Sequence, residues 1–94
     1  MPTYVRLANL TEQAVRNVQK LGDMIADAKK VLEANGCRLV QSWSTLGPYD
    51  FVAVVEGPDD ATMMKASALI AKQGNLRAIT LPAVSTTDFI AAVK

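Results

Sequence analysis

The 94-residue sequence predicts one α+β domain with strands and helices in the order β-α-β-β-α-β. Apolar residues recur at helical spacing in two long segments, whereas four short segments between residues 4 and 81 have the pattern of strands. Glycine, proline and asparagine mark the turns between these segments. Because a chain of this length forms a single domain, residues 1–94 are expected to fold as one unit.

The first predicted strand runs from Tyr4 to Ala8. Side chains alternate along a strand, so Val5 and Leu7 lie on one face of the sheet. Tyr4, Arg6 and Ala8 lie on the other face. This strand therefore offers one purely aliphatic face and one face that carries a charge.

A helix is predicted after this strand, with Asn9 or Thr11 as its cap. Asn9 and Glu12 have the spacing of a capping box. The apolar residues at helical spacing are Val15, Val18, Leu21, Ile25, Ala28 and Leu32. Gly22 interrupts them and predicts a kink or a break into two helices. Asn35-Gly36 ends the segment, since both residues tolerate the left-handed conformation.

The second predicted strand, Arg38 to Trp43, and the third, Phe51 to Glu56, are joined by a turn at Gly47-Pro48. The run from Phe51 to Val55 is apolar on both faces, which predicts that the strand is covered on both sides. Helices on one face leave the other for a second chain. We therefore expect that an isolated monomer is not the stable state.

The second half of the chain repeats the pattern of helix and strand. Gly57-Pro58-Asp59-Asp60 suits a helix start, because proline fits the first turn and acids fit the positive end of the helix dipole. Gly74 ends this helix, and Leu76 to Leu81 is the fourth strand, stopped by Pro82. Ser85 and Asp88 predict the cap of a short C-terminal helix. The order matches the ferredoxin-like arrangement, a four-stranded antiparallel sheet with helices on one face.

Composition excludes several classes of function. The net charge of +1 and the few aromatic residues argue against nucleic-acid binding. No apolar run is long enough to span a bilayer, and the N-terminus does not look like a signal peptide, so no membrane association is expected. The single cysteine, Cys37, fits a reducing, cytoplasmic location. With no histidine, a His-based active site, a His-ligated haem and a structural zinc site are excluded, so no metal and no cofactor are expected.

Three segments together resemble the GYD-domain family: Thr45-Leu46-Gly47-Pro48-Tyr49-Asp50-Phe51-Val52, Val54-Val55-Glu56-Gly57-Pro58-Asp59-Asp60 and Gly74-Asn75-Leu76-Arg77. The Gly, Tyr and Asp of the family name match Gly47, Tyr49 and Asp50, and Pro48 stands between the first two. The resemblance covers Tyr4 to about Leu81. It implies a ferredoxin-like dimeric α/β barrel, and hence a homodimer or a higher oligomer of dimers, but no reaction. Barrels of this class include haem-degrading and cofactor-free monooxygenases, which is an analogy of fold alone.

Six residues are candidates for binding a small ligand: Tyr4, Arg6, Trp43, Tyr49, Asp50 and Arg77. Turn chemistry also explains the loop residues, because glycine and proline form turns and Asp50 can accept backbone N–H bonds. Arg6 is costly on a covered strand unless it is paired. Its partner is expected to be Asp50, Glu56 or an anionic ligand. Of the sulfur-containing residues, Met24, Met63 and Met64 are expected to fill the core and Cys37 to be a buried, inert thiol.

The leading hypothesis is a small-ligand-binding or regulatory module without metal, whose ligand is anionic or carbonyl-bearing because two arginines are available. Its pocket is expected between sheet and helices or inside the barrel. The alternative is a cofactor-independent monooxygenase or isomerase acting on a phenolic or polyketide-like molecule. In that enzyme Tyr49 or Asp50 would accept a proton and Arg6 would stabilise an enolate. A nucleotide-sensing oligomer ranks last, since the chain lacks a glycine-rich phosphate loop.

Overall fold

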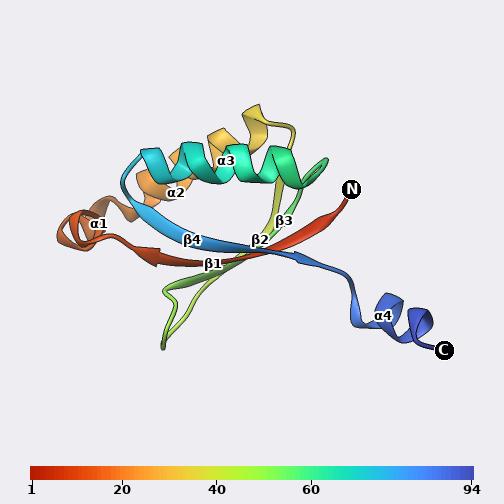
Figure 1. Cartoon of the computed structure of the whole chain (residues 1–94). Helices are drawn as coiled ribbons and strands as arrows, with labels where there is room; N and C mark the ends of the chain where they lie inside the picture. Colours follow the sequence, from red (N-terminus) through yellow and green to blue (C-terminus); the bar gives the residue numbers. More distant parts are fainter.

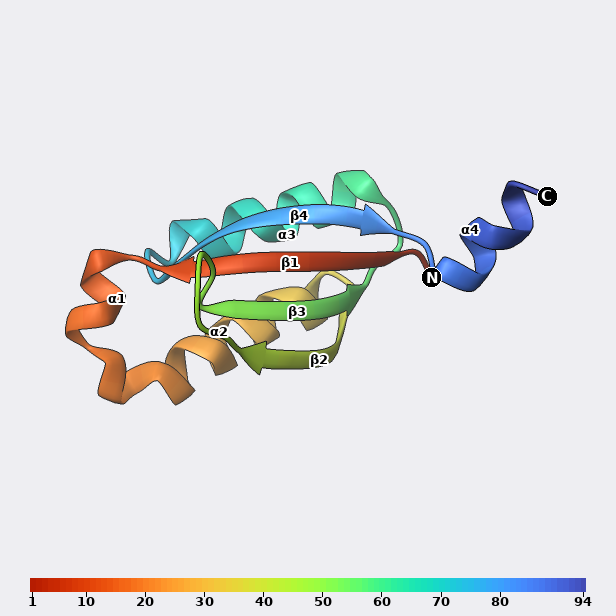
Figure 2. The same cartoon turned by 90° about the horizontal axis from the view of Figure 1, so that it is seen from below.

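Four strands form one antiparallel sheet in the order β2-β3-β1-β4 in the computed structural model, which describes residues 1–94 (Figure 1). The strands are β1 (Thr3–Leu10), β2 (Arg38–Ser44), β3 (Phe51–Glu56) and β4 (Leu76–Ala83). Helices α2 (Leu21–Ala34) and α3 (Asp60–Lys72) cover one face, and no helix covers the other (Figure 2). The predicted ferredoxin-like α+β fold is confirmed.

The first helical segment is broken earlier than the sequence predicts. Helix α1 (Glu12–Arg16) and a single 3-10 turn, η1 (Val18–Lys20), precede α2, so the break falls at Asn17 and not at Gly22. The cap of α1 is Thr11, whose side chain accepts a hydrogen bond from the N–H of Ala14 at 3.2 Å. Asn9 belongs to β1, so the predicted capping box between Asn9 and Glu12 is wrong.

Helix α1 and η1 lie beyond the end of the sheet (Figure 2). Val15 and Val18 are therefore 55% and 50% exposed, although both fit the helical apolar pattern. Only Ala14 of this segment is fully buried. The apolar pattern assumed one continuous helix. It fails for Val15 and Val18 because the chain breaks at Asn17 and the residues before α2 do not continue its buried face.

Strand β4 continues through Pro82 to Ala83, so the predicted stop at Pro82 is wrong. Strand β4 is at the edge of the sheet and pairs only with β1. Its outer side has no neighbouring strand, so the N–H that a proline lacks would form no hydrogen bond to a strand on that side. The last helix, α4 (Thr86–Ala92), begins at its predicted cap, Ser85, whose hydroxyl accepts from the N–H of Asp88 at 3.0 Å.

The hydrophobic core lies between the sheet and helices α2 and α3. Its largest fully buried side chains are Tyr4, Val55, Met63 and Ile70. Gly57 is a close approach in this core, since a Cβ there would lie 2.8 Å from the sulfur of Met63. Met24 and Met63 fill the core as predicted, but Met64 is 73% exposed. Cys37 is buried, and burial raises the pKa of its thiol, which keeps it protonated and unreactive.

Candidate functional site

The face of the sheet that no helix covers carries mainly apolar side chains, with Gln41 of β2 as a polar one opposite Val54. Strand register places on this open face Val5 and Leu7 of β1, Val52 and Val54 of β3, Ile79 and Leu81 of β4, and Trp43 of β2. Trp43, Ile79 and Leu81 are 48%, 49% and 44% exposed. Apolar side chains that the chain itself leaves in contact with water are therefore grouped on this face.

Charged groups lie only at the margins of the open face. Arg38 and Glu56 are paired across β2 and β3 and form an ion pair at 2.6 Å. Arg77 is exposed and pairs in register with Asn9 near the opposite end of the sheet. An apolar centre with a polar rim is the composition of a protein–protein interface.

Helix α4 projects away from the rest of the chain. It has no buried residue, and it lies on the side of the sheet opposite α2 and α3 (Figure 1). Val84, Phe89, Ile90 and Val93 are 72%, 58%, 48% and 66% exposed. This arm therefore presents a second apolar surface on the same side as the open face.

The hairpin between β2 and β3 is fastened to β1 through Asp50. Its carboxylate Oδ2 accepts the N–H of Leu10 at 2.9 Å, and its own N–H donates to the carbonyl of Ala8 at 2.9 Å. Thr45 closes the loop, since its hydroxyl donates to the carbonyl of Tyr49 at 2.6 Å. Gly47 has a φ of 105°, in the left-handed region that glycine tolerates. The Gly-Pro-Tyr-Asp turn thus has a structural task that its backbone contacts account for.

Arg6 lies on the opposite side of β1, under the helices, and is 6% exposed. Its Nη1 donates to the hydroxyl of Ser67 on α3 at 2.5 Å and to that of Thr80 on β4 at 2.8 Å. Neither Asp50 nor Glu56 is its partner, so that expectation is wrong: Asp50 bonds the backbone and Glu56 pairs with Arg38. Burial lowers the pKa of the guanidinium without any counter-charge to offset it.

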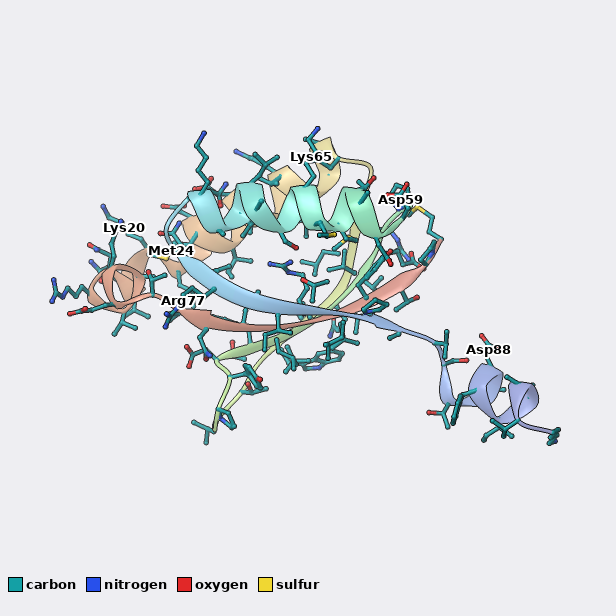
Figure 3. The ribbon with its side chains drawn as sticks, viewed as in Figure 1. Lys20, Met24, Asp59, Lys65, Arg77 and Asp88 are labelled. Atoms are coloured by element: carbon teal, nitrogen blue, oxygen red, sulfur yellow. The ribbon has the colours of Figure 1, made fainter.

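Tyr4 is buried beside Arg6 and donates its hydroxyl to Oδ1 of Asp60 at 2.6 Å. This hydrogen bond, together with burial, raises the pKa of Tyr4 to about 12. Figure 3 shows Asp59, the neighbour of Asp60, at the end of α3 nearest the N-terminus. Tyr4 is therefore a protonated hydrogen-bond donor at neutral pH and a poor proton acceptor.

The GYD domain family model matches residues 4–93. The chain belongs to the GYD domain family. The resemblance drawn from the Gly-Pro-Tyr-Asp turn and its flanking segments is confirmed. A protein of Thermus thermophilus, described as a glutamine synthetase and cystathionine beta-lyase binding protein, is 38% identical over 95 residues and is covered, like this chain, over 100% of its length.

A solved structure supports the fold of this GYD domain. The crystal structure of TTHA0845 from Thermus thermophilus superposes with a TM-score of 0.59, covering 92% of this chain and 96% of the other. At 20% identity this likeness shows the fold alone.

The GYD domain does not bring the six predicted ligand residues into one pocket. Tyr4 and Arg6 lie on the helix side of the sheet, Trp43 and Arg77 lie on the open side, and Tyr49 and Asp50 lie in the hairpin. The sheet itself separates the first pair from the second. The expectation of one shared pocket within a monomer therefore needs correction, while ligand binding by the individual residues stays a prediction.

Sequence reasoning missed three polar partners of the helix side: Asp60, Ser67 and Thr80. Thr80 is four residues after Leu76, so the alternation of side chains along a strand places both on the same face. The pairing register that brings Thr80 opposite Arg6 cannot be predicted from this alternation. Ser67 reaches Arg6 only through the packing of α3 on the sheet.

Two further observations bear on the class of site in the GYD domain. No group of three or more histidine, cysteine, aspartate or glutamate side chains is arranged to share a metal ion. None of the helices has the length and apolar character that crossing a bilayer requires.

Proposed function

We propose that this GYD-domain protein is a regulatory binding module that docks on other proteins and catalyses no reaction of its own. The observation that carries the proposal is the end-to-end relative at 38% identity, which is described as a binding protein for two enzymes. Because the alignment spans both chains in full, no extra domain of the relative accounts for that binding. By this proposal the partners are glutamine synthetase and cystathionine beta-lyase, or enzymes like them, in a reducing cytoplasm that keeps the free thiol of Cys37 intact.

The proposed working form is a homodimer joined through the open face. The seven aliphatic and aromatic residues that strand register places there are left partly exposed by the chain itself. A second copy removes this surface from water, which is worth roughly 25 cal/mol for each Å² of apolar area. The polar rim of Arg38 and Glu56 stays at the edge, where charges remain hydrated.

The arm formed by α4 supports the same assembly. It lies on the open-face side of the sheet and makes no core contact with its own chain (Figure 1). The arm projects past the end of the sheet on that side, so it can reach a copy placed against the open face (Figure 2). Phe89 and Ile90 would then pack on the partner instead of remaining in water.

No contact favours the alternative of a cofactor-independent monooxygenase or isomerase. Asp50 is engaged by the backbone of Leu10, and neither Tyr49 nor Asp50 lines the cavity that Arg6 lines. A proton acceptor and an enolate-stabilising cation need a shared substrate pose to act together. The geometry of the monomer provides none for these residues.

The proposal is tested by sedimentation of the purified protein mixed with glutamine synthetase or cystathionine beta-lyase from the same organism, with an unrelated enzyme of similar size as control. We expect co-sedimentation with at least one of the two enzymes, and the same result in a chelator. Failure of both enzymes to bind at tens of micromolar protein, or binding equal to that of the unrelated enzyme, contradicts the proposal. Turnover of a substrate by the purified protein alone would also contradict it.

A further inference from the structure

The Arg6 side chain is a buried cation without an anion. It is 6% exposed, and the ion pairs of the chain join Arg16 to Glu12 and Arg38 to Glu56, with Arg6 in neither. A buried charge that meets only neutral hydroxyls loses its hydration without a matching Coulomb gain. The fold nevertheless retains it at the centre of the sheet.

Much of the donor capacity of Arg6 is unused. Only Nη1 has protein partners, the hydroxyls of Ser67 and Thr80. No fully enclosed side-chain nitrogen or oxygen lacks a hydrogen-bond partner. Nε and Nη2 of Arg6, which have no hydrogen-bond partner, are therefore not fully enclosed, and a further acceptor can approach them.

Arg6 lines a cavity of about 60 Å³ between the sheet and the helices, which is partly open to solvent. Of its 13 lining residues 10 are hydrophobic, and the three others are Arg6, Lys29 and Ser42. The cavity thus has two cations and a hydroxyl in its wall and no carboxylate. Asp60, at the start of α3, lines a neighbouring groove and accepts a hydrogen bond from the hydroxyl of Tyr4.

A second copy of the chain cannot supply the missing anion. The cavity lies on the helix side of the sheet, whereas the proposed dimer uses the open face. The apolar remainder of the wall, with Leu32, Phe51 and Ile70 among its members, also rules out a fully hydrated ion. The lining of the cavity is complementary to a molecule that is anionic at one end and apolar over the rest.

We propose that this cavity binds a small monocarboxylate with a compact apolar body, of the size of a short branched-chain fatty acid. Its carboxylate accepts hydrogen bonds from the free nitrogens of Arg6, in the forked geometry that guanidinium groups provide. Lys29 adds a second positive charge, and the apolar body occupies the aliphatic part of the cavity. A volume of about 60 Å³ corresponds to roughly four water-sized probes, which limits the ligand to a few carbon atoms.

Ser67 and Thr80 act as positioning residues in this site. They hold Nη1 from the side of α3 and β4 and so direct the guanidinium plane without neutralising its charge. The site is on the other side of the sheet from the proposed dimer surface. If no ligand binds in this cavity, the proposed docking on enzymes is therefore unaffected.

The test is isothermal titration calorimetry of the purified protein with isobutyrate, compared with isobutyramide, which has the same shape without the charge, and with inorganic phosphate. We expect saturable binding of isobutyrate and weaker binding of both others, by about 10-fold or more. Equal binding of the amide would show that Arg6 plays no part. Equal binding of phosphate would show a non-specific anion effect, and no binding of isobutyrate up to about 50 mM would overturn the site.

Variants separate the site from the fold. Arg6→Met should abolish isobutyrate binding and leave the melting temperature equal or higher, because an apolar isostere relieves an unpaired buried charge. Lys29→Gln should weaken binding several-fold, and since Lys29 is exposed it should not affect folding. Lys65→Gln, at an exposed lysine of α3 outside the cavity (Figure 3), is the matched control and should change nothing. If Arg6→Met does not fold, Lys29→Gln against Lys65→Gln decides, and equal affinities of those two variants would contradict the proposal.

Discussion

At the scale of single residues, the turn that gives the family its name joins the β2–β3 hairpin to β1 through hydrogen bonds. The carboxylate of Asp50 accepts the N–H of Leu10, and the N–H of Asp50 donates to the carbonyl of Ala8, at 2.9 Å each. The hydroxyl of Tyr49 has no hydrogen-bond partner in the chain, so its ring and its backbone carbonyl are the parts in use. The two neighbours therefore differ in what their polar groups do.

This difference predicts opposite outcomes for two substitutions. Asp50→Ala should lower the free energy of unfolding by about 1–2 kcal/mol, because it leaves the N–H of Leu10 without its acceptor. Tyr49→Phe should change it by less than about 0.5 kcal/mol, since a free surface hydroxyl contributes little. Urea titrations of both variants and of the wild type measure this. An Asp50→Ala protein as stable as the wild type would make the turn a place to look for binding instead.

Tyr4 predicts a dependence of stability on alkaline pH. Its pKa is raised from 10.0 to about 12 in the folded chain by the hydrogen bond to Asp60 and by burial. The folded state thus holds the phenolic proton more tightly than the unfolded state does. The stability that this provides is complete below pH 10 and is lost as the pH rises through 12.

The measurement is the ultraviolet absorbance of tyrosinate in the Tyr49→Phe variant, in which Tyr4 is the remaining tyrosine. We expect ionisation near pH 12 that coincides with loss of the circular dichroism signal. Asp60→Asn should shift the ionisation to lower pH, since the carboxylate is the largest cause of the raised pKa. A midpoint near pH 10 in folded wild-type-like protein would show that the hydrogen bond is absent.

At the scale of elements, α4 predicts a separable arm. It has no buried residue, so removal of residues 85–94 should leave the melting temperature of the monomer unchanged. If Phe89 and Ile90 are buried on a partner, the truncation should raise the dimer dissociation constant by about 10-fold or more, as loss of one large apolar side chain costs about 1.5–3 kcal/mol. Sedimentation equilibrium over a range of concentrations measures it. A truncated chain that dimerises as tightly as the full chain would contradict the role given to the arm.

Elements whose signals are local could be predicted from the sequence. Ser85 caps α4 as predicted, through a hydroxyl that accepts the N–H three residues on, a relation that the sequence contains in full. Helix α3 starts within the predicted segment from Gly57 to Asp60, but its cap is Asp59, so Pro58 lies before the helix and not in its first turn. The break at Asn17 and the extension of β4 through Pro82 could not be predicted, because they depend on where the sheet ends and which strand is at its edge. The candidate site fared worse for the same reason. Arg6 was found, but its partners come from two other elements: strand register places Thr80 beside it, and the packing of α3 on the sheet places Ser67.

At the scale of the whole molecule, the open face makes the main prediction. Val54→Lys places a charge at the middle of that face, on a central strand. The fold should survive because the lysine can extend to water in the monomer. In the dimer the charge is buried without a partner, so the dissociation constant should rise by at least about 100-fold, equivalent to roughly 3 kcal/mol.

Ala68→Lys, at an exposed position on α3, is the matched control and should dimerise as the wild type does. Sedimentation velocity at micromolar concentration distinguishes the two species. A wild-type chain that sediments as a monomer throughout, or equal association of both variants, would contradict the proposed dimer.

The two edges of the sheet bear on how far such assembly can go. Pro82 removes an N–H from β4 near one end of that edge, and the register shift between Leu39 and Gln41 breaks the ladder of β2 near the other edge. Both features hinder a neighbouring chain from continuing the hydrogen-bonded sheet sideways. Growth into an endless ribbon is thereby discouraged, and association through a self-complementary face closes on itself after one partner. The protein can thus keep its apolar open face exposed at high protein concentration without nucleating fibres.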